Sequence, residues 1–224
     1  MSLIVRTVMA TRLMRFGIVL LGLTTVLVLL NGGFDRWLAL YLGAWSIFGL
    51  YAMVSIDDDL ARERFRPPEP GADRLPLRAI RLLALAHLVI GTLDAGRWHL
   101  APVPDTLRAI ALVVMVPAAL FVVQAMRANR FFSPVVRVQT ERGHRVIDGG
   151  PYRTIRHPGY LGMIVSVMAS GLALGSWLAF AFAALYAALI LRRVFFEDAF
   201  LQANLEGYAD YARRVPYRLI PGAW

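Results

Sequence analysis

The sequence contains no cysteine and no lysine, and it is poor in charged residues. Without cysteine the chain has no disulfide, no thiolate metal site and no cysteine nucleophile. Only 17% of the residues are charged, whereas 58% are hydrophobic and the mean hydropathy is +0.57. Soluble domains carry about 25% charged residues. The 224-residue chain is therefore expected to be a single membrane domain spanning residues 1–224.

Long apolar runs divide the chain, and they lie at residues 16–30, 37–54, 82–93, 107–126 and 161–191. The last run is too long for one crossing, because a helix rises about 1.5 Å per residue and a hydrocarbon core is about 30 Å thick. Gly175 and Ser176 interrupt it, which predicts a hairpin whose first arm is short for a full crossing. We expect an all-α integral membrane protein with about six transmembrane helices. Four spans would lie within residues 1–126, and residues 127–224 would hold the hairpin and a cytoplasmic cofactor pocket.

All 24 basic residues are arginines, and they gather between the apolar runs. With six spans, all except Arg36, Arg97 and Arg108 fall on one side of the membrane. Cytoplasmic loops are enriched in basic residues, so this side, with both termini, is expected to be cytoplasmic. The net charge of +9 is then explained without nucleic acid as a partner. The exclusive use of arginine suggests a GC-rich bacterial genome and hence the bacterial inner membrane. Residues 66–76, which are rich in proline, are expected to form a solvated connector.

Two polar segments, residues 137–160 and 192–224, flank the final hairpin. Folding the hairpin brings both segments to the same membrane face. Arg193 and Glu197 stand four residues apart on a helix that is expected to continue beyond the lipid. They form either a structural ion pair or one wall of a pocket that faces the polar residues around His157.

The same segments carry a family resemblance. "GHRVIDGGPYRTIRHPGYLG", "RRVFFEDAFL" and "GYADYARRVPYRLIPGAW" resemble the isoprenylcysteine carboxyl methyltransferase family and its phospholipid methyltransferase relatives. The resemblance covers residues 132–224. It implies an integral membrane enzyme that transfers a methyl group from S-adenosylmethionine to a lipophilic acceptor entering from the bilayer, without a metal.

The resemblance also implies roles for particular residues. The family's "HxLV", "GxY", "HPxY" and "EE" motifs, with the position seven residues before "HxLV", imply cofactor binding by Arg137, His144, Arg145, Val146, Ile147, Tyr152, His157, Pro158, Gly159, Tyr160, Glu197 and Asp198. Arg193 matches an arginine that lies at the substrate in the carboxyl methyltransferases, and we group Arg156 with it as a candidate catalytic residue. Two positions depart from the family pattern. Asp198 replaces a glutamate, and Arg137 stands where the animal enzymes have glutamine.

These residue types suit the cofactor on physical grounds. Arginine and histidine can hold its carboxylate through charge-assisted hydrogen bonds, Glu197 can pair with its ammonium group, and tyrosine rings can face its sulfonium. The acceptor stays open between an isoprenylcysteine-type carboxylate, a phospholipid and another small lipophilic group. A transporter or a structural membrane subunit is the alternative function. Tyr208, Tyr211 and Trp224 are expected to be interfacial aromatic residues, and His87 is expected to have a helix-packing role.

Overall fold

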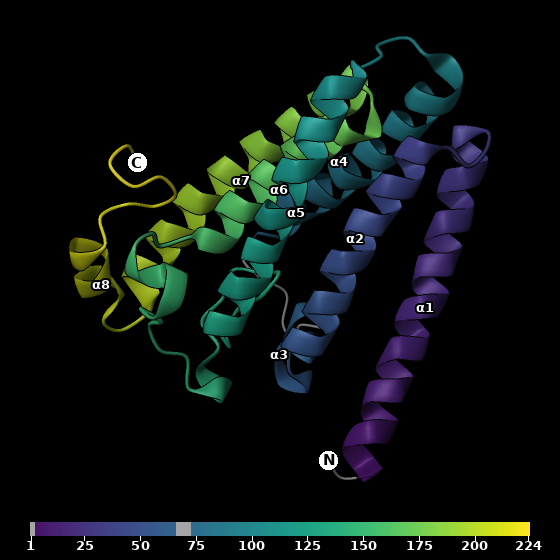
Figure 1. Ribbon diagram of the computed structural model, residues 1–224. Coiled ribbons are helices and arrows are strands. Elements are labelled where there is room, and N and C mark those ends of the chain that lie inside the picture. The colour runs from purple at the N-terminus through teal and green to yellow at the C-terminus, as the bar shows by residue number, and fades with distance from the viewer. Residues whose placement is uncertain (1–2, 66–72) are drawn as a thin grey trace.

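The computed structural model describes residues 3–65 and 73–224, and within these ranges every regular element is helical. The α-helices are α1 (Leu3–Asn31), α2 (Arg36–Ser55), α3 (Asp58–Phe65), α4 (Arg74–Leu93), α5 (Asp105–Ala128), α6 (Pro158–Leu174), α7 (Trp177–Asn204) and α8 (Tyr208–Arg214). The long helices lie side by side in a tilted bundle (Figure 1). Most of the connector expected at residues 66–76 lies outside the described residues.

Five helices are long and apolar enough to cross a membrane, and they contain the candidate spans Thr11–Asn31, Arg36–Ser55, Pro76–Trp98, Asp105–Ala128 and Trp177–Asn204. Helix α6, with 17 residues, is apolar but shorter. The expected arrangement of four helices followed by a hairpin is therefore present, and the first arm of the hairpin is the short one. Helix α7 also continues through the "RRVFFEDAFL" stretch, as its composition predicts.

The hairpin turn lies at Gly175 and Ser176, as the sequence predicts. Gly175 has a φ of 97°, a left-handed conformation that favours glycine, and it ends α6. The Ser176 hydroxyl oxygen accepts a hydrogen bond from the Ala179 amide at 3.1 Å and so caps the start of α7. A glycine and a serine thus turn one long apolar run into two helices.

Arg36, Arg97 and Arg108 were expected on the membrane side away from the other arginines, and two of them cap the ends of helices. Arg97 donates to the carbonyl oxygens of Leu30 at 2.9 Å and Leu29 at 2.7 Å, at the end of α1. Arg108 donates to the carbonyl of Leu174 at 2.9 Å, at the end of α6. A guanidinium group satisfies helix C-terminal carbonyls and complements the helix dipole. This local function explains why these arginines depart from the general charge bias.

A close helix–helix contact and a buried hydrogen-bond network hold the long helices together. A Cβ at Gly162 would come within 2.7 Å of Val122 Cγ2, so α5 and α6 approach at a distance that only glycine permits. His87 bonds to the Ala179 carbonyl at 3.0 Å and to the Ser170 hydroxyl at 2.9 Å, and Tyr41 bonds to the same hydroxyl at 2.8 Å. His87 therefore links α4 to α6 and α7, in agreement with the packing role expected for it.

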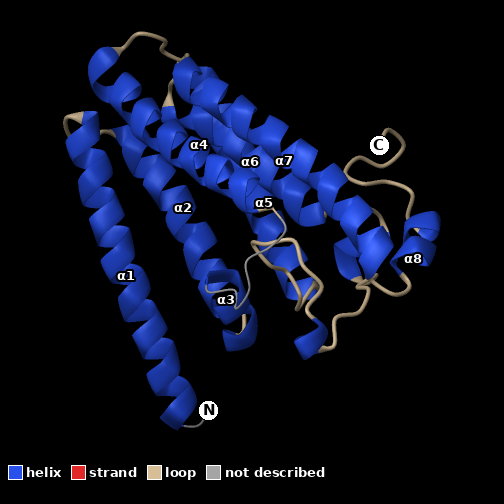
Figure 2. Ribbon diagram, turned by 180° about the vertical axis from the view of Figure 1, so that it is seen from behind, coloured by secondary structure: helices blue, strands red, loops and turns tan. Residues whose placement is uncertain are grey.

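The longest non-helical segments, between α5 and α6 and after α7, lie at the end of the bundle where α1 begins and α7 ends (Figure 2). Helix α3, the segment between α5 and α6, and α8 all lie there (Figure 1). The two polar segments that flank the hairpin in the sequence are thus brought to the same end, as the hairpin predicts.

Candidate functional site

A pocket of about 350 Å³ opens at this end of the bundle. Ligand sites usually have volumes of about 300–1,000 Å³. The pocket is lined by most of the predicted site residues, namely Arg137, His144, Arg145, Val146, Ile147, Tyr152, Arg156, His157, Gly159, Tyr160, Arg193 and Glu197. Pro158 and Asp198 do not line it. Residues from two distant parts of the sequence therefore share one cavity.

His144 is held by the backbone of the segment that precedes it. Its Nδ1 accepts a hydrogen bond from the Gln139 amide at 3.2 Å, and its ring packs on that of Phe131 with centroids 4.5 Å apart. An accepting Nδ1 assigns the proton to Nε2. Burial, together with the charges of Arg137 and Arg142, lowers the pKa of His144 to about 4. At neutral pH the imidazole is therefore neutral, and it offers one N–H donor.

Arg137 is fixed by two acids. Its guanidinium pairs with Glu63 of α3 at 2.8 Å and with Glu141 at 2.8 Å. Glu63 also accepts a hydrogen bond from the Ser133 hydroxyl at 2.7 Å. Helix α3 is thus bonded to the segment that forms one wall of the pocket. The family resemblance had indicated Arg137 but neither of its partners.

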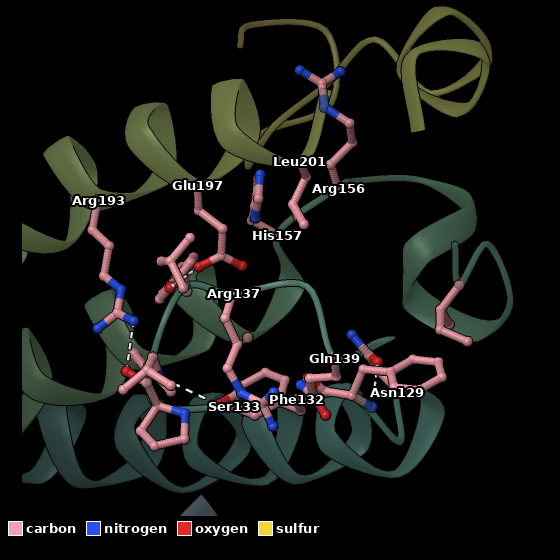
Figure 3. Close-up of a pocket in the computed structure, with 18 of the residues that line it drawn as sticks. Asn129, Phe132, Ser133, Arg137, Gln139, Arg156, His157, Arg193, Glu197 and Leu201 are labelled. Atoms are coloured by element: carbon pink, nitrogen blue, oxygen red, sulfur yellow. Dashed lines mark hydrogen bonds between the residues drawn. The ribbon is translucent and has the colours of Figure 1, made fainter. Parts of the chain in front are cut away.

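Arg193 and Glu197 point from α7 toward the segment that contains Ser133 (Figure 3). The side chain of Arg193 pairs with Asp73 at 2.9 Å and donates to the Pro134 carbonyl at 2.6 Å. Glu197 accepts a hydrogen bond from the Tyr160 hydroxyl. The Arg193–Glu197 ion pair considered from the spacing is not among the ion pairs of the described residues. Arg193 pairs with Asp73, at the start of α4, and not with Glu197.

Asp198 is fully buried and bonds to protein groups on every side. Arg156 contacts both of its oxygens, at 2.8 and 3.0 Å, and the Nε2 of His157 lies 3.2 Å from Oδ1. The carboxylate also accepts hydrogen bonds from Tyr208 and Arg218, each at 3.0 Å. Adjacent acids of one helix thus differ in surroundings, since Glu197 lines the pocket and Asp198 lies behind its wall.

The C-terminal segment holds the motif that precedes α6. The amides of Arg156 and His157 each donate at 2.9 Å, to the carbonyls of Tyr217 and Arg218 respectively. In Figure 3 the Arg156 side chain extends toward this segment, away from the side where Glu197 and Arg193 lie. It also donates to the Val215 carbonyl at 2.7 Å. These contacts anchor Arg156 in the pocket wall, and its assignment as a catalytic residue stays a prediction.

The expectation that Tyr208 and Tyr211 are interfacial aromatics is wrong. Both are buried, with 5% and 1% of their surface exposed, and both line the pocket. Tyr211 donates to the carbonyl of Tyr152 at 2.8 Å, and Tyr208 donates to Asp198. The short helix α8 folds back onto the bundle, so its aromatic residues pack against the pocket wall.

Several residues that line the pocket were not predicted from the sequence. Arg64 of α3 and Arg81 of α4 line the pocket, as do Phe132 and Tyr186. They lie between or within apolar runs, at spacings that form no motif. Their approach depends on how α3, α4 and α7 pack, which is a long-range property of the fold.

The lining side chains show what the pocket suits chemically. Guanidinium groups of Arg137 and Arg193 line it, together with the neutral His144 imidazole and the Glu197 carboxylate. The guanidinium groups suit anionic oxygen atoms, the imidazole N–H adds a neutral donor, and the carboxylate suits a cation. This donor set fits an amino-acid-like group that carries both charges.

Comparison with known proteins agrees with the motif assignment. Residues 109–203 match the isoprenylcysteine carboxyl methyltransferase (ICMT) family. The family resemblance is confirmed over this segment. It contains α6, most of α5 and nearly all of α7, and therefore most of the pocket residues predicted from the sequence.

Individual relatives match part of their length. A probable protein-S-isoprenylcysteine O-methyltransferase of rice (Oryza sativa subsp. indica) is 32% identical over 90 residues, which cover 39% of this chain and 47% of the relative. The Delta(14)-sterol reductase TM7SF2 of mouse is 36% identical over 87 residues, covering 38% of this chain but only 21% of the relative. The chain thus matches just under half of the rice protein.

A solved structure resembles the whole fold. The eukaryotic intramembrane Ras methyltransferase, an isoprenylcysteine carboxyl methyltransferase, aligns with a TM-score of 0.54 at 15% identity. The alignment covers 88% of this chain and 71% of that chain. At this identity the likeness shows that the two proteins share a fold, and it extends beyond the segment that matches the family.

Proposed function

We propose that this protein is an integral membrane methyltransferase that binds S-adenosylmethionine in the pocket and methylates a lipophilic acceptor. The observation that carries the proposal is the convergence of both motif segments on one cavity, which is lined by guanidinium groups, an imidazole and the Glu197 carboxylate. The match of residues 109–203 to a family of methyltransferases supports it. The concentration of polar groups at one end argues against a transporter, whose path needs such groups through several spans.

The residues present suit this cofactor. Arg137 and His144 would hold its carboxylate, Glu197 would pair with its ammonium group, and the tyrosine rings of the wall would face its adenine or sulfonium. Tyr160 donates to Glu197 and so orients the carboxylate that would meet the ammonium. When bound, the cofactor supplies an electrophilic methyl group. Asp198 and Arg156 would keep the His157–Tyr160 stretch in position.

The protein would act mainly by aligning the acceptor with the methyl group of the cofactor. Methyl transfer is a direct displacement, so the acceptor nucleophile, the methyl carbon and the sulfur must lie in line. Arg193 would orient the acceptor because its planar guanidinium fixes an anionic group in two directions. The pocket also has an apolar side, formed by residues such as Ile80, Ala84 and Met163, which would receive part of a lipid chain. The acceptor is proposed to be an isoprenylcysteine-type carboxylate, a phospholipid or another small lipophilic group.

The orientation in the membrane is part of the proposal. Most arginines lie at the pocket end of the bundle, so this end would face the cytoplasm, with both termini on that side. A bacterial inner membrane is the proposed location. The sulfur-bound methyl group would then come from the cytoplasmic cofactor pool, while the acceptor would come from the bilayer.

Transfer of a labelled methyl group tests the proposal. Purified protein would be incubated with methyl-labelled S-adenosylmethionine and a lipid extract of its host, and the organic phase would be analysed. We expect label in a discrete species with the parent protein and almost none with Glu197→Gln. Label that is absent with folded parent protein across several extracts would contradict the proposal.

A further inference from the structure

The pocket has a second group of arginines, outside the family motifs. Arg64 of α3 and Arg81 of α4 line the pocket together with Arg193, and they lie on the side formed by Leu77, Ile80, Ala84 and Tyr186. The segment that matches the family begins only at residue 109. These two arginines therefore belong to the part of the chain that the family match does not cover.

Among the described residues, neither arginine is paired with an acid. In the described ranges, 3–65 and 73–224, no ion pair joins a carboxylate to Arg64 or Arg81, whereas Arg137 and Arg193 have Glu63 and Asp73. The guanidinium of Arg64 instead lies 5.4 Å from the centre of the Phe132 ring. Burial lowers the pKa of Arg64, and the like charges of Arg193 and Arg81 act in the same direction. Three cations thus surround one side of the cavity, and Asp73 compensates only one of them.

The location of Arg81 connects this side of the pocket to the bilayer surface. Arg81 is exposed, and the next residue, Leu82, has 67% of its surface exposed. Leu85, one turn further along α4, is 58% exposed. Exposed leucines on an apolar helix suit contact with lipid, and Arg81 lies in the second turn of the candidate span Pro76–Trp98, near its pocket end. A long arginine side chain at such a position can reach the level of the lipid phosphates.

We propose that Arg64 and Arg81 form a phosphate-binding subsite, so that the methyl acceptor is an amphiphile whose head carries a phosphate besides the group at Arg193. A single carboxylate would be satisfied by Arg193 alone and would leave two cations unmatched. A phosphate offers several oxygens in tetrahedral arrangement and can accept from two guanidinium groups at once. This inference rests on the proposed function and narrows its substrate class from a lipophilic acceptor to a phosphate-bearing one.

A single-chain phospholipid and its phosphate-free counterpart test the subsite. Oleoyl lysophosphatidic acid, 1-oleoylglycerol and oleate would each be titrated into detergent-purified protein, with binding followed by thermal shift. The double variant Arg64→Gln/Arg81→Gln removes the proposed subsite. Arg62→Gln/Arg78→Gln is the matched control, because both residues are exposed, lie on the same two helices and do not line the pocket.

We expect lysophosphatidic acid to bind the parent and the control variant alike. It should bind the Arg64/Arg81 variant at least about tenfold more weakly, because that variant loses charge-assisted hydrogen bonds to the phosphate. Oleoylglycerol, which has no phosphate, should bind the parent and the control variant much more weakly than lysophosphatidic acid does. Equal weakening in both double variants would mean general surface attraction and would overturn the subsite. Oleate that binds as tightly as lysophosphatidic acid and depends equally on Arg64 and Arg81 would replace the phosphate by a carboxylate, which also overturns the proposal.

Binding of S-adenosylhomocysteine to the same preparations separates the two proposals. If every variant binds it while lysophosphatidic acid shows no dependence on Arg64 and Arg81, only the phosphate subsite fails. If the parent itself does not bind S-adenosylhomocysteine, the proposed function fails. Retained binding by the Arg64/Arg81 variant also shows that this variant is folded.

Discussion

Arg156 donates two hydrogen bonds to Asp198, from Nε to Oδ1 at 2.8 Å and from Nη2 to Oδ2 at 3.0 Å. The two side chains are 5% and 0% exposed. The pair joins the start of the α6 motif to α7, and the C-terminal segment closes over it. This one carboxylate also contacts His157, Gln202, Tyr208 and Arg218.

Asp198→Asn should therefore destabilise the fold. The substitution leaves Arg156 buried without its counter-charge, and breaking a buried pair in this way costs about 3–5 kcal/mol. Thermal unfolding of the purified protein would show a clearly lower midpoint. Asp210→Asn is the control, because Asp210 and its partner Arg213 are exposed, with 61% and 75% of their side-chain surface accessible. Midpoints that fall equally in both variants would contradict the role given to Asp198.

Glu197→Gln should weaken cofactor binding and leave the stability of the fold nearly unchanged. Glu197 lines the pocket and is bonded to Tyr160, so the amide would lose the charge offered to the cofactor but few structural contacts. We expect S-adenosylhomocysteine to bind more weakly by about 1–3 kcal/mol, while the unfolding midpoint without ligand changes little. Calorimetric titration measures the first quantity. Unchanged affinity would remove Glu197 from the cofactor site.

Arg193→Lys should separate acceptor binding from cofactor binding. Lysine keeps the charge that pairs with Asp73 but loses the planar, two-pronged set of donors. A misplacement of about 1 Å can slow such a reaction roughly a hundredfold, so methyl transfer should fall strongly while affinity for S-adenosylhomocysteine stays near that of the parent. Parental turnover in the lysine variant would reduce Arg193 to a structural partner of Asp73.

The pH dependence of stability should contain a contribution from His144. Its pKa is lowered from 6.5 to about 4 in the folded protein, because burial and the nearby arginines disfavour the imidazolium. As pH falls below about 6.5 the unfolded chain takes up a proton that the folded protein does not, so stability decreases between about pH 6.5 and pH 4. His144→Gln should show a smaller loss of unfolding midpoint over this range than the parent. Identical losses would contradict the assignment.

The sequence predicted the helices well because membrane spans are a local property. Runs of apolar residues form helices wherever backbone groups cannot reach water, and Gly175 with Ser176 marks the turn. Most motif residues also converge as predicted, since a hairpin necessarily brings its flanking segments together. The family resemblance supplied their assignment to a cofactor. Spacing alone left Arg193 and Glu197 open between an ion pair and a pocket.

The rest of the site depends on contacts between distant segments. Asp73 and Glu63 pair with Arg193 and Arg137 because α3 and the start of α4 fold against the pocket, and no periodicity in those residues indicates this. The burial of Tyr208 and Tyr211 depends on α8 folding back, so a composition typical of interfacial aromatics was misleading. The family's "EE" motif assigned Asp198 to the cofactor together with Glu197, but motif spacing does not show that the two side chains have different surroundings, because neighbouring residues of a helix point in different directions.

Titration of the purified protein with S-adenosylhomocysteine, followed by calorimetry, tests whether the pocket is the cofactor site. We expect saturable binding to a single site in the parent, weakened in Glu197→Gln and retained in Arg62→Gln, whose side chain does not line the pocket. If folded parent protein shows neither binding heat nor a thermal shift, the pocket does not bind the cofactor and the protein is not a methyltransferase of this kind.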